Sequence, residues 1–129
     1  MFYLDTSAAA KLVVAERGSA TLLRWLRSRD ERIFSSDLLR TELLRATRRA
    51  APEQMVQART VLESLLLLRL TSTICERAAM LEPDLLRSLD ALHLAAALEM
   101  GDELEGLVTY DRRLAAGANV LGISVVAPA

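Results

Sequence analysis

Four acidic residues stand at positions where they could do chemistry: Asp5, Glu42, Asp90 and Asp111. Asp5 and Asp111 each follow a short apolar run and precede a helical pattern, which places them where a strand meets a helix. Glu42 and Asp90 fall among apolar residues of predicted helices, where a carboxylate is costly to desolvate without a partner or a cation. Two such charges about 4 Å apart, at an effective dielectric near 20, repel by roughly 4 kcal/mol. A cluster of the four therefore predicts a bound divalent cation, or a proton held at raised pKa.

Each acid also has a purely structural interpretation. Asp5 and Asp111 could cap helices, and Asp90 could act as a cap near a helix start. Glu42 could reach water or pair with the arginine three positions on. His93 lies on the same Ala/Leu-rich helix as Asp90, where a lone histidine is more often a hydrogen-bonded core residue than a catalyst; it could simply orient Asp90. The functional interpretation thus depends on whether the fold brings the four acids together.

Short apolar runs that alternate with helical patterns would position these acids. We expect strands near residues 3, 33, 70, 107 and 124, which indicates an α/β fold with a mostly parallel sheet covered on both faces. We expect the intervening helices at 8–12, 18–29, 38–50, 52–67, 74–81, 88–98 and 111–117, and a last strand over 119–126. The ends of the first and fourth strands could lie side by side, which would bring Asp5 near Asp111. No linker or repeat divides the 129 residues, so we expect one domain, 1–129.

The composition indicates how charge is distributed along the chain and in which compartment the protein works. Residues 1–70 hold 12 Lys and Arg against 8 Asp and Glu, and residues 71–129 hold 4 against 9. This asymmetry fits a basic surface and an acidic site, or only two differently solvated faces. The arginines between 24 and 32 could contact an RNA backbone or be simply solvated, and Trp25 could mark a partner surface, although core packing is the more frequent explanation. The single Cys75 fits a reducing cytoplasm, and we expect no signal peptide and no membrane span.

The segments around the four acids, taken together, resemble a known family. They are Leu4-Asp5-Thr6-Ser7-Ala8, Thr41-Glu42-Leu43, Leu89-Asp90-Ala91-Leu92-His93-Leu94-Ala95 and Val108-Thr109-Tyr110-Asp111-Arg112-Arg113-Leu114. In this order they look like a PIN domain and, more narrowly, like the VapC-type toxins of bacterial toxin–antitoxin pairs. The resemblance spans essentially the whole chain, and all four acidic positions are kept. It implies a three-layer PIN-like α/β fold with about five strands.

The resemblance also implies a function. It implies a Mg²⁺-dependent endoribonuclease, with Mn²⁺ as a possible substitute, that hydrolyses RNA phosphodiester bonds with a metal-activated water. The implied catalytic residues and metal ligands are Asp5, Glu42, Asp90 and Asp111, of which Asp5 and Asp90 are the best candidates for direct metal contact. Thr6, Ser7 and Thr109 would orient these acids through their hydroxyls. The family further implies a cytoplasmic homodimer and a VapB-type antitoxin whose tail blocks the acidic cleft.

Three other interpretations compete with a nuclease. A phosphatase of the haloacid-dehalogenase type needs a second Asp two residues after the first, where Ser7 stands. A phospho-receiver domain needs a Lys late in the chain, and the only Lys is Lys11. A non-catalytic PIN-like module that binds RNA or protein usually lacks some of the acids, whereas this sequence has all four.

Overall fold

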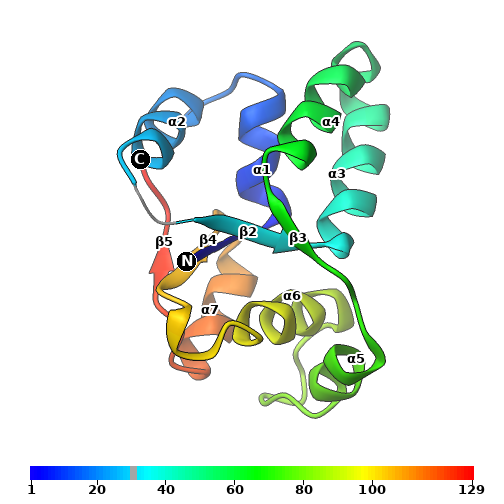
Figure 1. The fold of residues 1–129 in the computed structure, drawn as a ribbon, viewed down its shortest axis with the longest axis vertical. Coiled ribbons are helices and arrows are strands. Elements are labelled where there is room, and N and C mark those ends of the chain that lie inside the picture. Colours follow the sequence, from blue (N-terminus) through cyan, green and yellow to red (C-terminus); the bar gives the residue numbers. More distant parts are fainter. Residues whose placement is uncertain (30–31) are drawn as a thin grey trace.

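The computed structural model describes residues 1–29 and 32–129, and within them five strands form one parallel sheet. The strand order is β3-β2-β1-β4-β5, and every neighbouring pair runs parallel (Figure 1). The strands are β1 (Phe2–Leu4), β2 (Ile33–Ser36), β3 (Leu66–Leu68), β4 (Gly106–Val108) and β5 (Val125–Val126). The predicted parallel α/β architecture is confirmed.

Helices cover both faces of this sheet. They are α1 (Thr6–Val13), α2 (Ser19–Arg27), α3 (Asp37–Ala50), α4 (Met55–Glu63), α5 (Ser72–Ala79), α6 (Ser88–Leu98) and α7 (Arg112–Val120), with 3₁₀ turns η1 (Pro52–Gln54) and η2 (Gly101–Glu103). Figure 1 shows α1 to α4 on one side of the sheet and α5 to α7 on the other. Side chains along β1 alternate between the two resulting cores: Phe2 and Leu4 pack with α1 to α4, and Tyr3 packs with α5 to α7. The result is the expected three-layer fold.

The topology reverses beside β1. The chain passes from β1 through β2 to β3 at one edge, then returns to place β4 against the other side of β1. In open α/β sheets, ligands bind beyond the carboxyl ends of the strands at such a reversal. Leu4 pairs with Val108, so the residues that follow them, Asp5 and Thr109, emerge next to each other. The reversal therefore makes the carboxyl ends of β1 and β4 the expected place for a ligand.

Several predicted boundaries are wrong. The strand expected near residue 70 lies at Leu66–Leu68, because these leucines pair with Phe34–Ser36 of β2; the preceding helix therefore stops at Glu63 rather than at Leu67. The next helix begins two residues early, at Ser72, since the Thr71 hydroxyl accepts a hydrogen bond from the Ile74 amide and caps it.

The last strand is also shorter than expected. Helix α7 continues to Val120, so β5 keeps only Val125 and Val126. On α3, Thr47 is buried one turn after Leu43, whereas Ala46 is exposed.

Trp25, the arginines near it and Cys75 were the other residues that the sequence singled out. Trp25 packs edge-on against Phe2, with ring centroids 5.0 Å apart, and the Arg29 guanidinium lies 4.6 Å from the Trp25 ring centroid. Core packing thus accounts for Trp25. The other arginines of this region, and Cys75, are exposed. Among the described residues, no helix has the length and apolar character that a membrane crossing requires.

Candidate functional site

Asp5 is a buried carboxylate at the carboxyl end of β1. It caps α1: its Oδ1 accepts the Ala8 amide at 3.0 Å and the Ser7 hydroxyl at 2.8 Å. Its Oδ2 accepts the Thr109 hydroxyl at 2.7 Å. The side chain is only 3% exposed, and no basic group of the described residues pairs with it. Burial raises the pKa of Asp5 above its ordinary value, although the hydrogen bonds from Thr109, Ala8 and Ser7 oppose that shift.

Ser7 and Thr109 connect the first and fourth strand ends. Their hydroxyl oxygens lie 3.3 Å apart, and both also bond to Asp5. The Thr109 hydroxyl oxygen in turn accepts the backbone N–H of Asp111 at 3.0 Å. Two of the three predicted hydroxyls therefore surround Asp5, and they link it to the loop that carries Asp111.

Glu42 lies on α3 and receives two short hydrogen bonds on the same oxygen. The Thr6 hydroxyl donates to Oε1 at 2.6 Å, and His93 Nε2 lies 2.6 Å from that atom. Burial raises the pKa of Glu42, but the hydrogen bonds from His93 and Thr6 outweigh it and leave the pKa below its ordinary value. Glu42 is therefore ionised at neutral pH. Its partners come from two other helices, and among the described contacts no ion pair joins it to Arg45.

A buried chain of hydrogen bonds continues from His93. Its Nδ1 lies 2.7 Å from the Tyr3 hydroxyl, which lies 2.8 Å from Ser36 Oγ. The prediction that His93 is a hydrogen-bonded core residue is confirmed, but its two nitrogens meet Tyr3 and Glu42 rather than Asp90. Sequence reasoning missed Tyr3 and Ser36. The available signal was a tyrosine in a fully buried strand, whose hydroxyl needs a partner.

Asp90 and Asp111 form the less enclosed part of the site. Asp90 lies in the first turn of α6 and is partly buried; burial and the negative charge of Asp111 raise its pKa, against weaker opposing effects of nearby basic residues. Asp111 is exposed and caps α7, accepting the backbone amides of Arg113 and Leu114 at 2.8 and 3.1 Å. Both strand-end acids thus serve as helix caps, whereas Asp90 accepts no capping bond.

The donor set suits a hard cation, although the side chains do not form a closed cage. Within residues 1–29 and 32–129, no three Asp, Glu, His or Cys side chains lie close enough together to hold a metal ion. Asp5 nevertheless offers buried oxygens that only hydroxyls and an amide contact, and Asp90 has an acidic neighbour. Mg²⁺ keeps several waters and binds proteins through one or two carboxylates. Carboxylates such as those of Asp5 and Asp90 are the type of ligand that this coordination uses.

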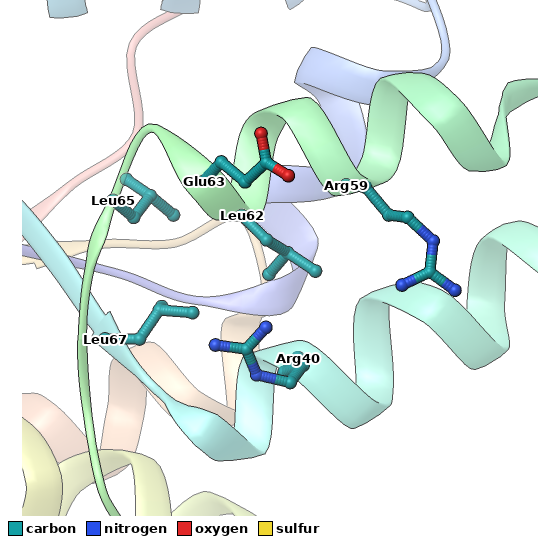
Figure 2. A pocket seen from close by; sticks show the side chains of 6 residues that line it. All are labelled: Arg40, Arg59, Leu62, Glu63, Leu65 and Leu67. Carbon is teal, nitrogen blue, oxygen red and sulfur yellow. The ribbon is translucent and has the colours of Figure 1, made fainter.

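Two hollows elsewhere on the surface contain none of the four acids. One, of about 320 Å³, lies beside β3; Figure 2 shows Arg59 and Arg40 extending beside it from α4 and α3. The other, of about 820 Å³, is bounded by α1, α2 and α4. The chemistry at the strand ends is therefore separate from both.

Comparisons with known proteins identify the family of this chain. The family model of the PIN domain matches residues 2–119. The chain is 40% identical over 132 residues to Ribonuclease VapC47 of Mycobacterium tuberculosis (strain CDC 1551 / Oshkosh), covering 99% of this chain and 97% of that protein.

Solved structures share the fold. One is Mycobacterium tuberculosis VapC20, described as a sarcin-ricin loop cleaving toxin, with a TM-score of 0.77 at 17% identity over 99% of this chain and 100% of that one. Another is a toxin–antitoxin complex from Klebsiella pneumoniae, with a TM-score of 0.76 at 22% identity over 100% and 98%. This chain therefore belongs to the PIN domain family and is one of its VapC-type members.

Proposed function

We propose that this protein is the toxin of a toxin–antitoxin pair and acts as a Mg²⁺-dependent endoribonuclease. The observation that carries the proposal is Asp5, an almost fully buried carboxylate at a strand end, with raised pKa and no ion pair to a basic group among the described residues. Such a group is costly unless a cation or proton compensates it. The ribonuclease name of the curated relative supports RNA as the substrate.

The residues of the site would have different roles. Asp5 and Asp90 would hold the cation, which when bound supplies an activated water and charge to stabilise the developing oxyanion. Ser7 and Thr109 fix both oxygens of Asp5 through their hydroxyls, so that the carboxylate is already oriented. Glu42 and Asp111 would contribute through ordered water. No side-chain nucleophile is needed for this hydrolysis.

Cleavage of labelled total RNA by the purified, antitoxin-free protein tests the proposal. We expect discrete fragments with Mg²⁺, none with EDTA and none from Asp5→Asn. The matched control is Asp102→Asn, which removes the same charge from an exposed 3₁₀ turn and should cleave like wild type. A folded wild type that binds RNA but cuts no RNA pool would instead identify a non-catalytic module.

We propose two protein partners, an antitoxin of the VapB type and a second copy of this chain. The hollow between α1, α2 and α4 supports the first, because apolar residues such as Leu12, Leu23 and Val61 line it and Leu23 is 38% exposed. Such a groove suits the apolar face of a partner helix. Co-expression with candidate antitoxins, followed by light scattering of the free and bound toxin, would give both stoichiometries. A strictly monomeric free toxin would contradict the homodimer.

A further inference from the structure

We propose that His93 and Tyr3 are positioning residues for Glu42: the Tyr3 hydroxyl holds the imidazole, and the imidazole Nε2–H holds one oxygen of the Glu42 carboxylate. The inference rests on the proposed nuclease function and deepens it, because it gives a role to two buried residues that lie outside the acidic set. Neither residue needs to touch RNA or metal in this role.

The first support is the distribution of hydrogen bonds on Glu42. Both Thr6 Oγ1 and His93 Nε2 contact Oε1, each at 2.6 Å. Among the described residues, no hydrogen bond reaches Oε2. One oxygen of the carboxylate is therefore anchored, and the other remains available to a water or ligand in the site. Anchoring a catalytic carboxylate in advance removes the cost of ordering it during the reaction.

The second support is the direction in which hydrogens are donated along the series of hydrogen bonds from Ser36 through Tyr3 and His93 to Glu42. Glu42 Oε1 is a carboxylate oxygen that already accepts the Thr6 hydroxyl, so the hydrogen between this atom and His93 lies on Nε2. Nδ1 then meets the Tyr3 hydroxyl at 2.7 Å, and that hydroxyl has a second partner in Ser36 Oγ at 2.8 Å. Among the described residues, every buried polar side-chain atom of Ser36, Tyr3 and His93 has a partner, as a buried network requires.

The third support is packing that prevents the two rings from turning. Tyr3 is fully buried and packs edge-on against Phe34, with centroids 5.2 Å apart at 87°. It packs on His93 in the same way, at 5.7 Å and 75°. His93 is 4% exposed within α6. The network thus ties α6 to β1 and, through Glu42, to α3, on opposite faces of the sheet.

Substitutions at His93 test whether the Nε2 hydrogen bond is what matters. The amide of His93→Gln can still donate to Glu42, whereas His93→Leu fills similar space with no donor. We expect His93→Leu to lower kcat by about 10- to 100-fold with KM unchanged, the usual loss when a partner of a site carboxylate is removed. We expect His93→Gln to retain kcat within about threefold, a rescue that a merely space-filling role would not produce.

Tyr3→Phe tests the second link, because it removes one hydroxyl and keeps the ring. We expect kcat about tenfold lower and KM unchanged. The matched control is Tyr110→Phe, which removes a hydroxyl that bonds to the Pro128 carbonyl instead, and should behave like wild type.

His93 is the only histidine, so the ¹⁵N imidazole spectrum of untagged protein should show a single Nε2 bound to hydrogen. An unprotonated Nε2 would overturn the proposed direction.

Calorimetric titration with Mn²⁺ provides a readout that needs no RNA. We expect about tenfold weaker binding in His93→Leu, and wild-type binding in His93→Gln and Tyr110→Phe. Equal kcat and equal Mn²⁺ affinity in wild type and a folded His93→Leu would overturn the inference. So would His93→Gln losing as much as His93→Leu while its melting temperature stays at the wild-type value. If wild type cuts no RNA but the Mn²⁺ affinities follow the expected order, the nuclease proposal fails and the positioning role stands.

Discussion

Replacing Asp5 with Asn should abolish cleavage and yet leave the metal-free protein as stable as wild type, or more stable. Asn is as good a helix cap as Asp, and its side-chain oxygen can keep the bonds from the Ala8 amide and the Ser7 hydroxyl. The bond at risk is the one from Thr109 to Oδ2, at 2.7 Å. A hydrogen bond to a charged group contributes about 1.5–3 kcal/mol.

Against that loss stands the relief of a buried charge. The effective cost of burying an ion is several kcal/mol, and Asp5 is 3% exposed. The raised pKa shows that burial outweighs the hydrogen bonds in the ionised form. We therefore expect Asp5→Asn to stabilise the metal-free fold by about 1 kcal/mol at pH 7, which is roughly 3 to 5 °C in Tm for a chain of this size.

The raised pKa of Asp5 also predicts how the effect on stability depends on pH. Because the folded-state pKa of Asp5 lies above the ordinary 3.8, the stability that protonated Asp5 contributes is fully present below that value and is lost as pH rises through the folded pKa. Asp5→Asn lacks this decline. The stability advantage of the variant should thus appear above the folded-state pKa and vanish on acidification below pH 3.8.

Calorimetric melting in EDTA, from acidic to neutral pH, would measure both effects, with Asp102→Asn as the control for loss of one surface charge. A Tm for Asp5→Asn that falls more than about 5 °C below wild type, with the control unchanged, would refute the reasoning. It would mean that the ionised carboxylate stabilises the fold as a cap, and the assignment of Asp5 to a metal site would lose its main support.

Three further predictions concern the same site and the sheet beneath it. Asp90→Asn should reduce cleavage and leave Tm unchanged or higher, because burial and the charge of Asp111 raise the pKa of Asp90 and its side chain makes no capping bond; a lower Tm would instead indicate a structural role. Mg²⁺ at 100 times its Kd should stabilise wild type by about 2.7 kcal/mol and leave Asp5→Asn unaffected in thermal melts; equal shifts would place the cation elsewhere. Gly106→Ala should cost about 1–3 kcal/mol in urea unfolding, since its Cβ would lie 3.0 Å from the Ser124 carbonyl oxygen; an unchanged midpoint would show that β4 and β5 can separate without penalty.

Much of the fold and part of the site followed from the sequence. The alternation of apolar runs and helical patterns predicted a parallel sheet. The position of Asp5 and Asp111 directly after apolar runs predicted that both would lie at strand ends. These features depend on residues a few positions apart, such as a capping carboxylate and the amide three residues on. Strand β3 was predicted near residue 70 and lies instead at Leu66–Leu68, because these leucines suit a helix as well as a strand and only pairing with β2 decides between the two.

The partners of the site residues were decided by the tertiary structure. From the sequence, the partner of the Glu42 carboxylate could be water, a neighbouring arginine or a metal. In the fold, the carboxylate accepts hydrogen bonds from His93, 51 residues away, and from Thr6, 36 residues away. Asp5 and Asp111 occupy equivalent places in the sequence pattern, yet one is buried and the other exposed. Residue type and spacing determined which groups could do chemistry. Burial and long-range contacts depend on how α3 and α6 dock on opposite faces of the sheet, and that docking decided which of those groups are ionised, anchored and close to one another.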